Sequence, residues 1–271
     1  CGPMPIKLLL IDPQNDFCDL PGAALPVPGA DADMRRLARF MSTVRREIAD
    51  VIITLDSHAS VGIERPPFWE TGDGGPVAPF TVITERDVRE GKFRPRDPAL
   101  QTQVLDYLRA LEQGGRYQLM VWPVHCVVGT WGHNLHEAVA NEVASWEAHA
   151  LRPAWRVLKG QNPMTEQYSA IRAEVPSESD PATQTNERLI ARVRPNGGML
   201  FVAGEAASHC VMATMEHLFE VFSPDECRKV VLLRDCMSPV TGFEDKAEAF
   251  FAQATARGVR VLTSEEAMTL I

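Results

Sequence analysis

The chain has 271 residues, of which 45% are hydrophobic, 23% charged and 7% aromatic, and its formal net charge is −9. These fractions are ordinary for a soluble globular protein, and this length can bury a large core within one domain. The negative charge argues against nucleic acid and against anionic membrane surfaces as partners. No apolar run is long enough to span a bilayer, and we expect no signal peptide before the first strand. The sequence therefore predicts one soluble domain over residues 4–271.

The cysteines are scattered along the chain, and no two of them form a Cys-x-x-Cys pair. In a domain of this size such scatter favours reduced thiols and a cytoplasmic location. Residues 1–3 precede Met4 and are interpreted as a remnant of protein expression, so they are left out of the fold prediction. The six cysteines are Cys1, Cys18, Cys126, Cys210, Cys227 and Cys236.

The first half of the chain alternates between apolar runs and segments with helical periodicity. Asp12-Pro13 ends the first apolar run, and Asp31 or Asp33 is the expected N-cap of the first helix. The interval 60–98 is rich in proline and is predicted to be a long irregular loop within the domain, of the kind that often serves as a lid or binding loop. A short strand over 80–84 is left open within it. The predicted elements are a strand over 6–11, a helix up to 48, a strand over 51–55, a helix over 100–114, a strand over 118–121 and a helix from about 134.

The second half continues the alternation. Asp180-Pro181 supplies an N-cap and first turn, and Cys210 begins a segment whose apolar residues share one helical face. The predicted elements are a strand over 155–158, a helix over 180–193, a strand over 199–203, a helix from 210, a strand over 229–233, a helix over 244–256, a strand over 259–262 and a terminal helix. Strands that alternate with helices, without hairpin signals, predict an α/β fold: a mostly parallel sheet covered by helices on both faces, as in a Rossmann-like three-layer sandwich.

Polar side chains follow five of the predicted strands directly. Because the carboxyl ends of parallel strands share one edge of a sheet, where ligands bind, we expect these side chains to form one site. Each of them alone has a plain alternative as a turn residue, a solvated charge or a loop histidine. The residues are Asp12, Asp56 with His58, His125, Lys159 and Cys210.

The five positions separate into two chemical groups. Asp56, His58 and His125 suit a divalent ion, with zinc the first candidate and manganese or iron as alternatives, and three protein ligands leave positions open for water or substrate.

The second group is Cys210 with Lys159 and Asp12. At a helix N-terminus beside a cation, a thiol is expected to have a lowered pKa, and Asp12 can take and return its proton. The small residues from Gly204 to Ser208 let backbone amides approach a ligand, as an oxyanion hole requires. His209 is interpreted as a pocket wall, since adjacent side chains in a turn point apart.

Together these motifs resemble the nicotinamidase branch of the isochorismatase-like cysteine hydrolases, over nearly the full chain. The matching pieces are Leu-Leu-Ile-Asp12-Pro-Gln-Asn-Asp-Phe17, Asp56-Ser-His58, Trp122-Pro-Val-His125-Cys-Val-Val-Gly-Thr-Trp-Gly, Lys159-Gly160 followed by Tyr168-Ser-Ala, and Gly204-Glu-Ala-Ala-Ser-His-Cys210-Val.

The resemblance implies a role for each of these positions. It implies a triad of Asp12, Lys159 and Cys210, and an oxyanion hole made by the amides of Ala206 and Cys210, after a cis peptide between Glu205 and Ala206. It also implies metal ligands at Asp56, His58 and His125, and a substrate ring held by Phe17, Trp122 and Tyr168.

The chain also departs from the family pattern. Relatives usually carry an aliphatic residue where Glu205 stands, and an aspartate where Ser208 stands. Glu64 falls where some relatives place a further metal ligand, although a salt-bridged loop charge is the simpler interpretation. These departures leave the chemistry in place and the substrate open.

The leading hypothesis is a metal-dependent cysteine amidohydrolase that converts nicotinamide to nicotinate and ammonia through a Cys210 thioester, in pyridine nucleotide biosynthesis. The alternatives are hydrolysis of another aromatic amide or of an aliphatic amide or carbamoyl compound, and a non-catalytic ligand- or metal-binding protein on the same scaffold. We expect a small-molecule partner and leave a homo-oligomer open.

Overall fold

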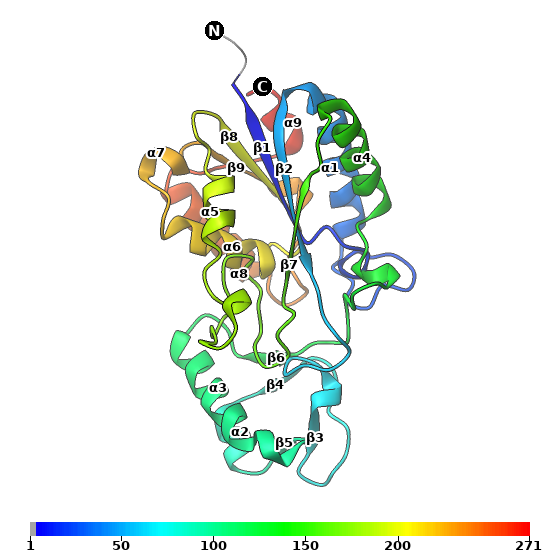
Figure 1. Ribbon diagram of the computed structural model, residues 1–271, viewed down its shortest axis with the longest axis vertical. Coiled ribbons are helices and arrows are strands. Elements are labelled where there is room, and N and C mark those ends of the chain that lie inside the picture. Colours follow the sequence, from blue (N-terminus) through cyan, green and yellow to red (C-terminus); the bar gives the residue numbers. More distant parts are fainter. Residues whose placement is uncertain (1–3) are drawn as a thin grey trace.

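A computed structural model describes residues 4–271, and the proposed expression remnant at 1–3 lies outside the described residues. Six strands form one sheet in the order β10-β9-β8-β1-β2-β7, and every neighbouring pair is parallel (Figure 1). The predicted α/β fold with a parallel central sheet is thus confirmed. The sheet strands are β1 (Ile6–Ile11), β2 (Ile48–Asp56), β7 (Trp155–Lys159), β8 (Met199–Gly204), β9 (Val230–Leu233) and β10 (Arg260–Leu262).

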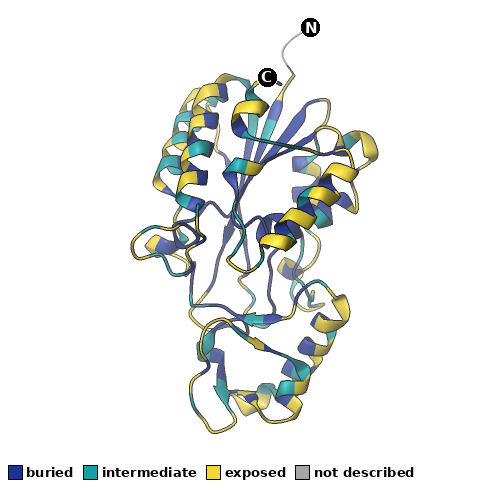
Figure 2. Ribbon diagram, turned by 180° about the vertical axis from the view of Figure 1, so that it is seen from behind, coloured by how far each residue is buried: buried dark blue, intermediate teal, exposed yellow. Residues whose placement is uncertain are grey.

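Helices cover both faces of this sheet, and alternate residues of the strands meet them. In β1, Leu8 and Leu10 belong to the hydrophobic cluster on one face, whereas Leu9 and Ile11 belong to the cluster on the other. The strands are buried between helices whose outer surfaces are exposed (Figure 2). One face carries α1 (Ala30–Val44), α4 (Glu137–Ala150) and α9 (Ser264–Met268), and the other carries α5 (Glu187–Val193), α6 (Cys210–Phe219), α7 (Pro224–Cys227) and α8 (Glu244–Ala256).

The chain changes direction across the sheet beside β1. It runs from β1 to β2 and on to β7 at one edge, then returns to the other side of β1 for β8, β9 and β10. β1 and β8 are therefore neighbours whose following connections move apart, and such a switch point opens a ligand-binding crevice at the carboxyl edge. Asp12 follows β1 directly, and Gly204 ends β8.

Residues 61–121 form a separate lobe beyond this carboxyl edge, at the bottom of Figure 1. The lobe has two short antiparallel pairs, β3 with β5 and β4 with β6, and a hydrophobic cluster of its own that includes Trp69, Leu108 and Val121. Its elements are β3 (Trp69–Thr71), β4 (Thr81–Ile83), α2 (Glu85–Arg89), β5 (Phe93–Pro95), α3 (Gln101–Gly114) and β6 (Leu119–Val121).

The lobe corrects two predictions. The interval 60–98 is not irregular, because its apolar residues pack against α3, β3 pairs with β5, and β4 pairs with β6. The short strand considered over 80–84 is present as β4, whereas β3 and β5 are too short to leave a periodic signal. The strand predicted over 118–121 exists as β6, but it pairs with β4 and does not join the main sheet.

Three helix starts also differ from expectation. Gly29, with φ 91°, precedes α1, so neither Asp31 nor Asp33 is its N-cap. The helix expected from 134 begins at Glu137, where the His136 side chain accepts the N–H of Ala138. The helix expected over 180–193 is split into a 3-10 turn, Pro181–Thr183, and α5. Within residues 4–271, no helix combines the length and the apolar character needed to cross a membrane.

Candidate active site

Lys159 connects the polar residues that follow β1, β2 and β8. Its Nζ lies 2.9 Å from Oδ2 of Asp12 and 3.2 Å from Oδ1 of Asp56, and it contacts Sγ of Cys210 at 3.5 Å. It also donates to the carbonyl of Gln167 at 3.1 Å. All of these side chains are buried, so the structure brings Asp12, Lys159 and Cys210 together in one cluster at the switch point.

Asp12 is held rigidly at the end of β1. Its backbone φ is 45°, its N–H donates to Thr54, and its Oδ1 accepts the Thr54 hydroxyl at 2.6 Å. The other oxygen, Oδ2, lies 2.9 Å from Nζ of Lys159, which in turn contacts the Cys210 sulfur. One oxygen is therefore fixed by Thr54, while the other faces the lysine.

The pKa of the Cys210 thiol differs from the sequence-based expectation. Burial raises the pKa of Cys210 well above its ordinary value, and the opposing effect of Lys159 is smaller. The sequence-based expectation of a lowered thiol pKa is therefore wrong: the helix N-terminus and the lysine do not offset the loss of water and the two carboxylates. Burial also raises the pKa of Asp12, which makes this carboxylate a better proton acceptor than one in water. Burial lowers the pKa of Lys159, but Asp12 and Asp56 outweigh it and keep the lysine charged.

The loop between β8 and α6 presents unused backbone donors beside the thiol. The N–H groups of Glu205, Ala207, His209 and Val211 all donate to carbonyl oxygens. Within residues 4–271, the amides of Ala206 and of Cys210 have no such backbone acceptor. The Glu205–Ala206 peptide is cis, as the resemblance implied.

This loop requires glycine at position 204. The residue has φ 133°, and a Cβ there would lie 1.9 Å from the Ile11 carbonyl oxygen. A side chain would therefore push the loop away from β1 and from Asp12.

Asp56, His58 and His125 form a group whose ligand atoms all lie within 4.8 Å of one another. Nε2 of His58 is 2.9 Å and Nε2 of His125 is 3.2 Å from Oδ2 of Asp56. The Nδ1 atoms of the two rings lie 2.9 Å from the carbonyl of Gly160 and 2.6 Å from that of Pro123. Donation from Nδ1 leaves a lone pair on each Nε2 directed at the same carboxylate oxygen. This donor set fits a divalent ion such as zinc.

His125 reaches this group by a route that differs from the predicted one. It follows β6 of the lobe, so four main-sheet strands and one lobe strand contribute to the site, instead of five strands of one sheet. Two backbone hydrogen bonds fix the segment that follows His125 beside His58. The N–H of His58 donates to the Cys126 carbonyl, and the His58 carbonyl accepts the N–H of Val128.

Glu64 lies behind His58. Its Oε1 forms an ion pair with Arg65 at 3.0 Å and lies 3.8 Å from Nδ1 of His58, the ring atom directed away from Asp56. Glu64 is therefore the salt-bridged loop charge of the simpler interpretation, although it is buried and not solvated.

Aromatic side chains surround a narrow inner cavity above Cys210. The three residues expected to hold a substrate ring, Phe17, Trp122 and Tyr168, line it, and so does His209, the expected pocket wall. The indole N–H of Trp122 donates to the Tyr168 hydroxyl at 3.0 Å. Burial lowers the pKa of His209 from 6.5 to about 3, so its ring is neutral and acts as an uncharged wall.

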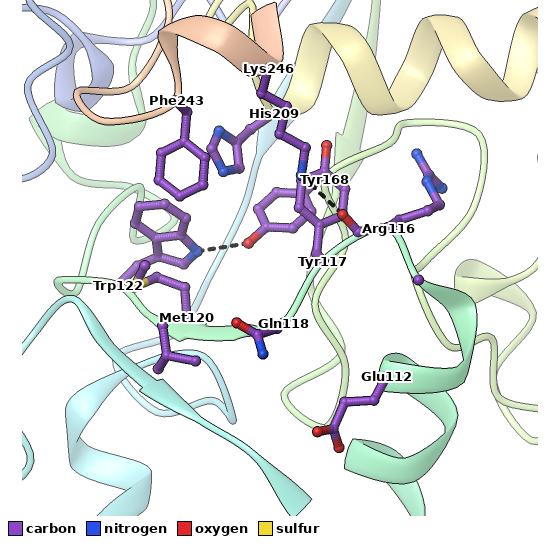
Figure 3. Close-up of a pocket in the computed structure, with 12 residues that line it drawn as sticks. Glu112, Arg116, Tyr117, Gln118, Met120, Trp122, Tyr168, His209, Phe243 and Lys246 are labelled. Carbon is purple, nitrogen blue, oxygen red and sulfur yellow. Dashed lines mark hydrogen bonds between the residues drawn. The ribbon is translucent and has the colours of Figure 1, made fainter. Parts of the chain in front are cut away.

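A wider outer cavity of about 430 Å3 adjoins the inner one (Figure 3). Trp122, Tyr168 and His209 line both cavities and so form the partition between them, while Phe243 and Lys246 belong to the outer wall. Nζ of Lys246 lies 3.8 Å from the centre of the Tyr117 ring and donates to the Arg116 carbonyl. A compound that reaches Cys210 from the outer cavity must pass this aromatic partition, which favours a small, flat molecule.

Several site residues were not predicted. Thr54 was detectable, because it is a polar residue inside an otherwise apolar strand. Glu166, which lines the inner cavity, and Phe243 and Lys246 on the outer wall had no such signal, since they lie on loops and a helix whose position depends on the tertiary fold.

Comparison with known proteins identified one similar sequence and several similar folds. A 138-residue segment is 26% identical to the nicotinamidase of Saccharomyces cerevisiae and covers 51% of each chain, so this match spans about half the length of the curated relative. No family model matches the sequence. The solved yeast nicotinamidase has a TM-score of 0.65 at 21% identity and covers 95% of this chain and 99% of its own.

Two further structures extend the match. A pyrazinamidase of Pyrococcus horikoshii in complex with zinc has a TM-score of 0.53 at 21% identity, with coverage of 95% and 98%. An isochorismatase family protein of Desulfovibrio vulgaris has a TM-score of 0.52 at 18% identity, with coverage of 99% and 98%. The chain has the isochorismatase-like fold. The resemblance to nicotinamidases and isochorismatase-like hydrolases drawn from the motifs is confirmed.

Proposed function

We propose that the protein is a cysteine amidohydrolase that acts on a small carboxamide, with nicotinamide as the first candidate substrate. The observation that carries the proposal is the cluster in which Nζ of Lys159 contacts both Asp12 and the Cys210 sulfur beside two unused backbone amides. The similarity to yeast nicotinamidase supports the choice of amide, and the aromatic partition supports a flat ring. The cysteine pattern supports a cytoplasmic location. Hydrolysis of nicotinamide would place the enzyme in pyridine nucleotide biosynthesis.

The first half of the reaction makes a thioester. Asp12 accepts the Cys210 proton as the sulfur attacks the amide carbon, so that no free thiolate has to exist in the resting enzyme. The N–H groups of Ala206 and Cys210 would hold the oxyanion, each worth about 3 kcal/mol in the transition state. Collapse of the intermediate breaks the C–N bond, and Asp12 returns the proton to the departing ammonia.

The second half releases the acid. Asp12 takes a proton from a water molecule that attacks the thioester carbon. As the C–S bond breaks, Asp12 returns this proton to the leaving sulfur, which restores the Cys210 thiol and the carboxylate. Lys159 stays charged throughout and balances the negative charge that passes between Asp12 and the sulfur. We propose Asp56, His58 and His125 as ligands of a divalent ion, zinc first, which when bound would supply a Lewis acid at the pocket wall.

The test is ammonia release from a panel of amides: nicotinamide, pyrazinamide, benzamide and an aliphatic carbamoyl compound, with metal analysis of the same preparation. We expect turnover of at least one aromatic amide and a bound divalent ion. Cys210→Ala should abolish turnover, whereas Cys227→Ala, at a buried cysteine on α7, should keep it. Turnover that persists in Cys210→Ala would refute the mechanism. Turnover of the aliphatic compound alone would change the proposed substrate class from aromatic to aliphatic amides. Metal uptake without any turnover would favour a binding protein.

A further inference from the structure

Glu205 is a completely buried acidic residue between the last residue of β8 and the amides of the proposed oxyanion hole. Its Oε2 accepts the N–H of Ser238 at 3.0 Å, and its own N–H donates to the Ile11 carbonyl at 2.8 Å. The catalytic steps proposed above do not use the Glu205 side chain.

Three hydrogen bonds join the oxyanion loop, residues 204–208, to a second segment, residues 237–243, which we name the β9–α8 loop. Besides the Glu205 bond, the N–H of Ala207 donates to the Ser238 carbonyl at 2.9 Å, and the N–H of Val240 donates to the Ser208 hydroxyl at 3.0 Å. The β9–α8 loop in turn supplies Val240 to the inner cavity and Phe243 to the outer one. The oxyanion donors and part of the substrate wall are thus one hydrogen-bonded unit.

The surroundings of Glu205 favour a protonated side chain. Within residues 4–271 it forms no ion pair, and its nearest acidic neighbour is Asp33 on α1, which pairs with Arg36 at 2.9 Å. A buried, unpaired carboxylate beside a second carboxylate is costly, so the neutral form is favoured. A neutral carboxyl group can donate its O–H to Asp33 while its other oxygen accepts the Ser238 N–H. Asp33 also accepts the Ser238 hydroxyl at 2.6 Å, which closes the network.

We propose that Glu205 is a positioning residue: its protonated side chain ties the oxyanion loop and the β9–α8 loop to α1 and so fixes the Ala206 amide beside Cys210. This inference rests on the proposed amidase function for its catalytic consequence. The arrangement of the two loops does not depend on that function.

The experiment compares Glu205→Gln with Glu205→Leu. Gln reproduces a neutral carboxyl group, since its carbonyl can accept from Ser238 and its amide can donate to Asp33. Leu is close to the aliphatic residue of the relatives but makes neither bond. Glu226→Leu is the matched control. Glu226 lies on the remote helix α7, accepts the backbone N–H of Ser223 and pairs with Arg194.

For nicotinamide hydrolysis, normalised to the folded fraction from near-ultraviolet circular dichroism, Glu205→Leu should lower kcat by about tenfold to a hundredfold with little change in KM. Glu205→Gln should keep kcat near the wild-type value, and so should Glu226→Leu. If kcat falls equally in Glu205→Gln and Glu205→Leu, the protonated side chain does not act as a hydrogen-bond donor. If Glu205→Leu keeps the wild-type kcat, Glu205 has no positioning role.

Hydrogen exchange separates this inference from the proposed function, because it needs no substrate. Glu205→Leu should raise amide exchange in both residues 204–211 and 237–243, whereas Glu205→Gln should not. If the wild-type protein hydrolyses no amide, the amidase proposal fails, and exchange alone decides whether Glu205 joins the loops. Should Glu205→Leu not fold, Ser238→Ala removes only the hydroxyl bond to Asp33 and should still raise exchange in the β9–α8 loop; unchanged exchange in that variant would overturn the network.

Discussion

The main sheet and the lobe of residues 61–121 both contribute to the walls of the pocket, but their architectures differ. The sheet has six parallel strands buried between two layers of helices, and its polar site residues occur where strands end. The lobe has three-residue strands, one small hydrophobic cluster and an exterior of exposed ion pairs such as Arg86 with Glu90 and Arg109 with Glu85.

This difference assigns separate tasks to the two regions. The sheet places Asp12 directly after β1, which is paired with strands on both sides, and Lys159 at the end of the edge strand β7, while Cys210 begins the helix that follows β8. Groups fixed at the ends of regular elements suit the proposed proton exchange. The lobe contributes Trp122 and His125 from the segment after β6, and these side chains shape the approach to the sulfur. Variants in the sheet edge should therefore change the chemical step, whereas variants in the lobe should change access and local stability.

The largest effect is expected for Asp12→Asn. The amide keeps the size of the side chain and can still accept the Thr54 hydroxyl, but it cannot take the Cys210 proton, so kcat should fall by about 10²- to 10⁴-fold. Asp50→Asn is the matched control on the same sheet: Asp50 lies near the opposite end of β2 and pairs with Arg192 at 2.7 Å. The control should change kcat by less than about twofold. Steady-state ammonia release measures both, and a kcat for Asp12→Asn close to that of Asp50→Asn would exclude Asp12 as the proton acceptor.

The sheet edge could be predicted from the sequence because its signals are local. An apolar run that stops at Asp12-Pro13, or a strand followed by small residues and Cys210, fixes both a strand and its end. Parallel topology then brings those ends together without further information. The residues of the two groups came from this reasoning and from the resemblance, and the structure brings each group together.

The lobe could not be predicted in the same way. Each of its strands has only three residues, too few to show a period of two, and Pro95 gives β5 the composition of a loop. The raised pKa of Cys210 was missed for a related reason: burial depends on the whole tertiary structure, whereas the helix N-terminus and the lysine are visible locally. Glu205 was noticed as unusual, but its contacts with Asp33 and Ser238 join segments far apart in the chain.

An intermediate effect is expected for Leu108→Ala in α3. Leu108 is completely buried in the lobe cluster, so its truncation should cost about 2–5 kcal/mol of local stability. If the lobe is a cooperative unit of its own, amide exchange should rise within 61–121 and stay low in β1 and β8. Leu10→Ala, at a buried position of β1, should cost a similar amount but raise exchange across the main sheet. Equal patterns for the two variants would show that sheet and lobe unfold together.

The smallest effect concerns His217 of α6, which lies where the main domain meets the outer cavity. Its Nε2 faces Nη1 of Arg116 at 2.5 Å and its Nδ1 lies 2.7 Å from the Ser169 hydroxyl, so the ring accepts from the guanidinium and must be neutral. Burial, followed by the positive charge of Arg116, lowers the pKa of His217 from 6.5 to about 3.

Between these two pH values the unfolded chain binds a proton that the native protein does not, so the free energy of unfolding falls as the pH drops from 6.5 towards 3. His217→Gln removes this titration and should reduce the loss of stability between pH 7 and pH 5 by about 2 kcal/mol, measured by urea unfolding at each pH. His149→Gln, at an exposed position of α4, should leave the pH dependence of the wild-type protein unchanged. If the free energy of unfolding of the His217 variant keeps the pH dependence of the wild-type protein, the pKa of His217 is not lowered in the native state. That result would exclude the neutral ring as the acceptor of the Arg116 guanidinium.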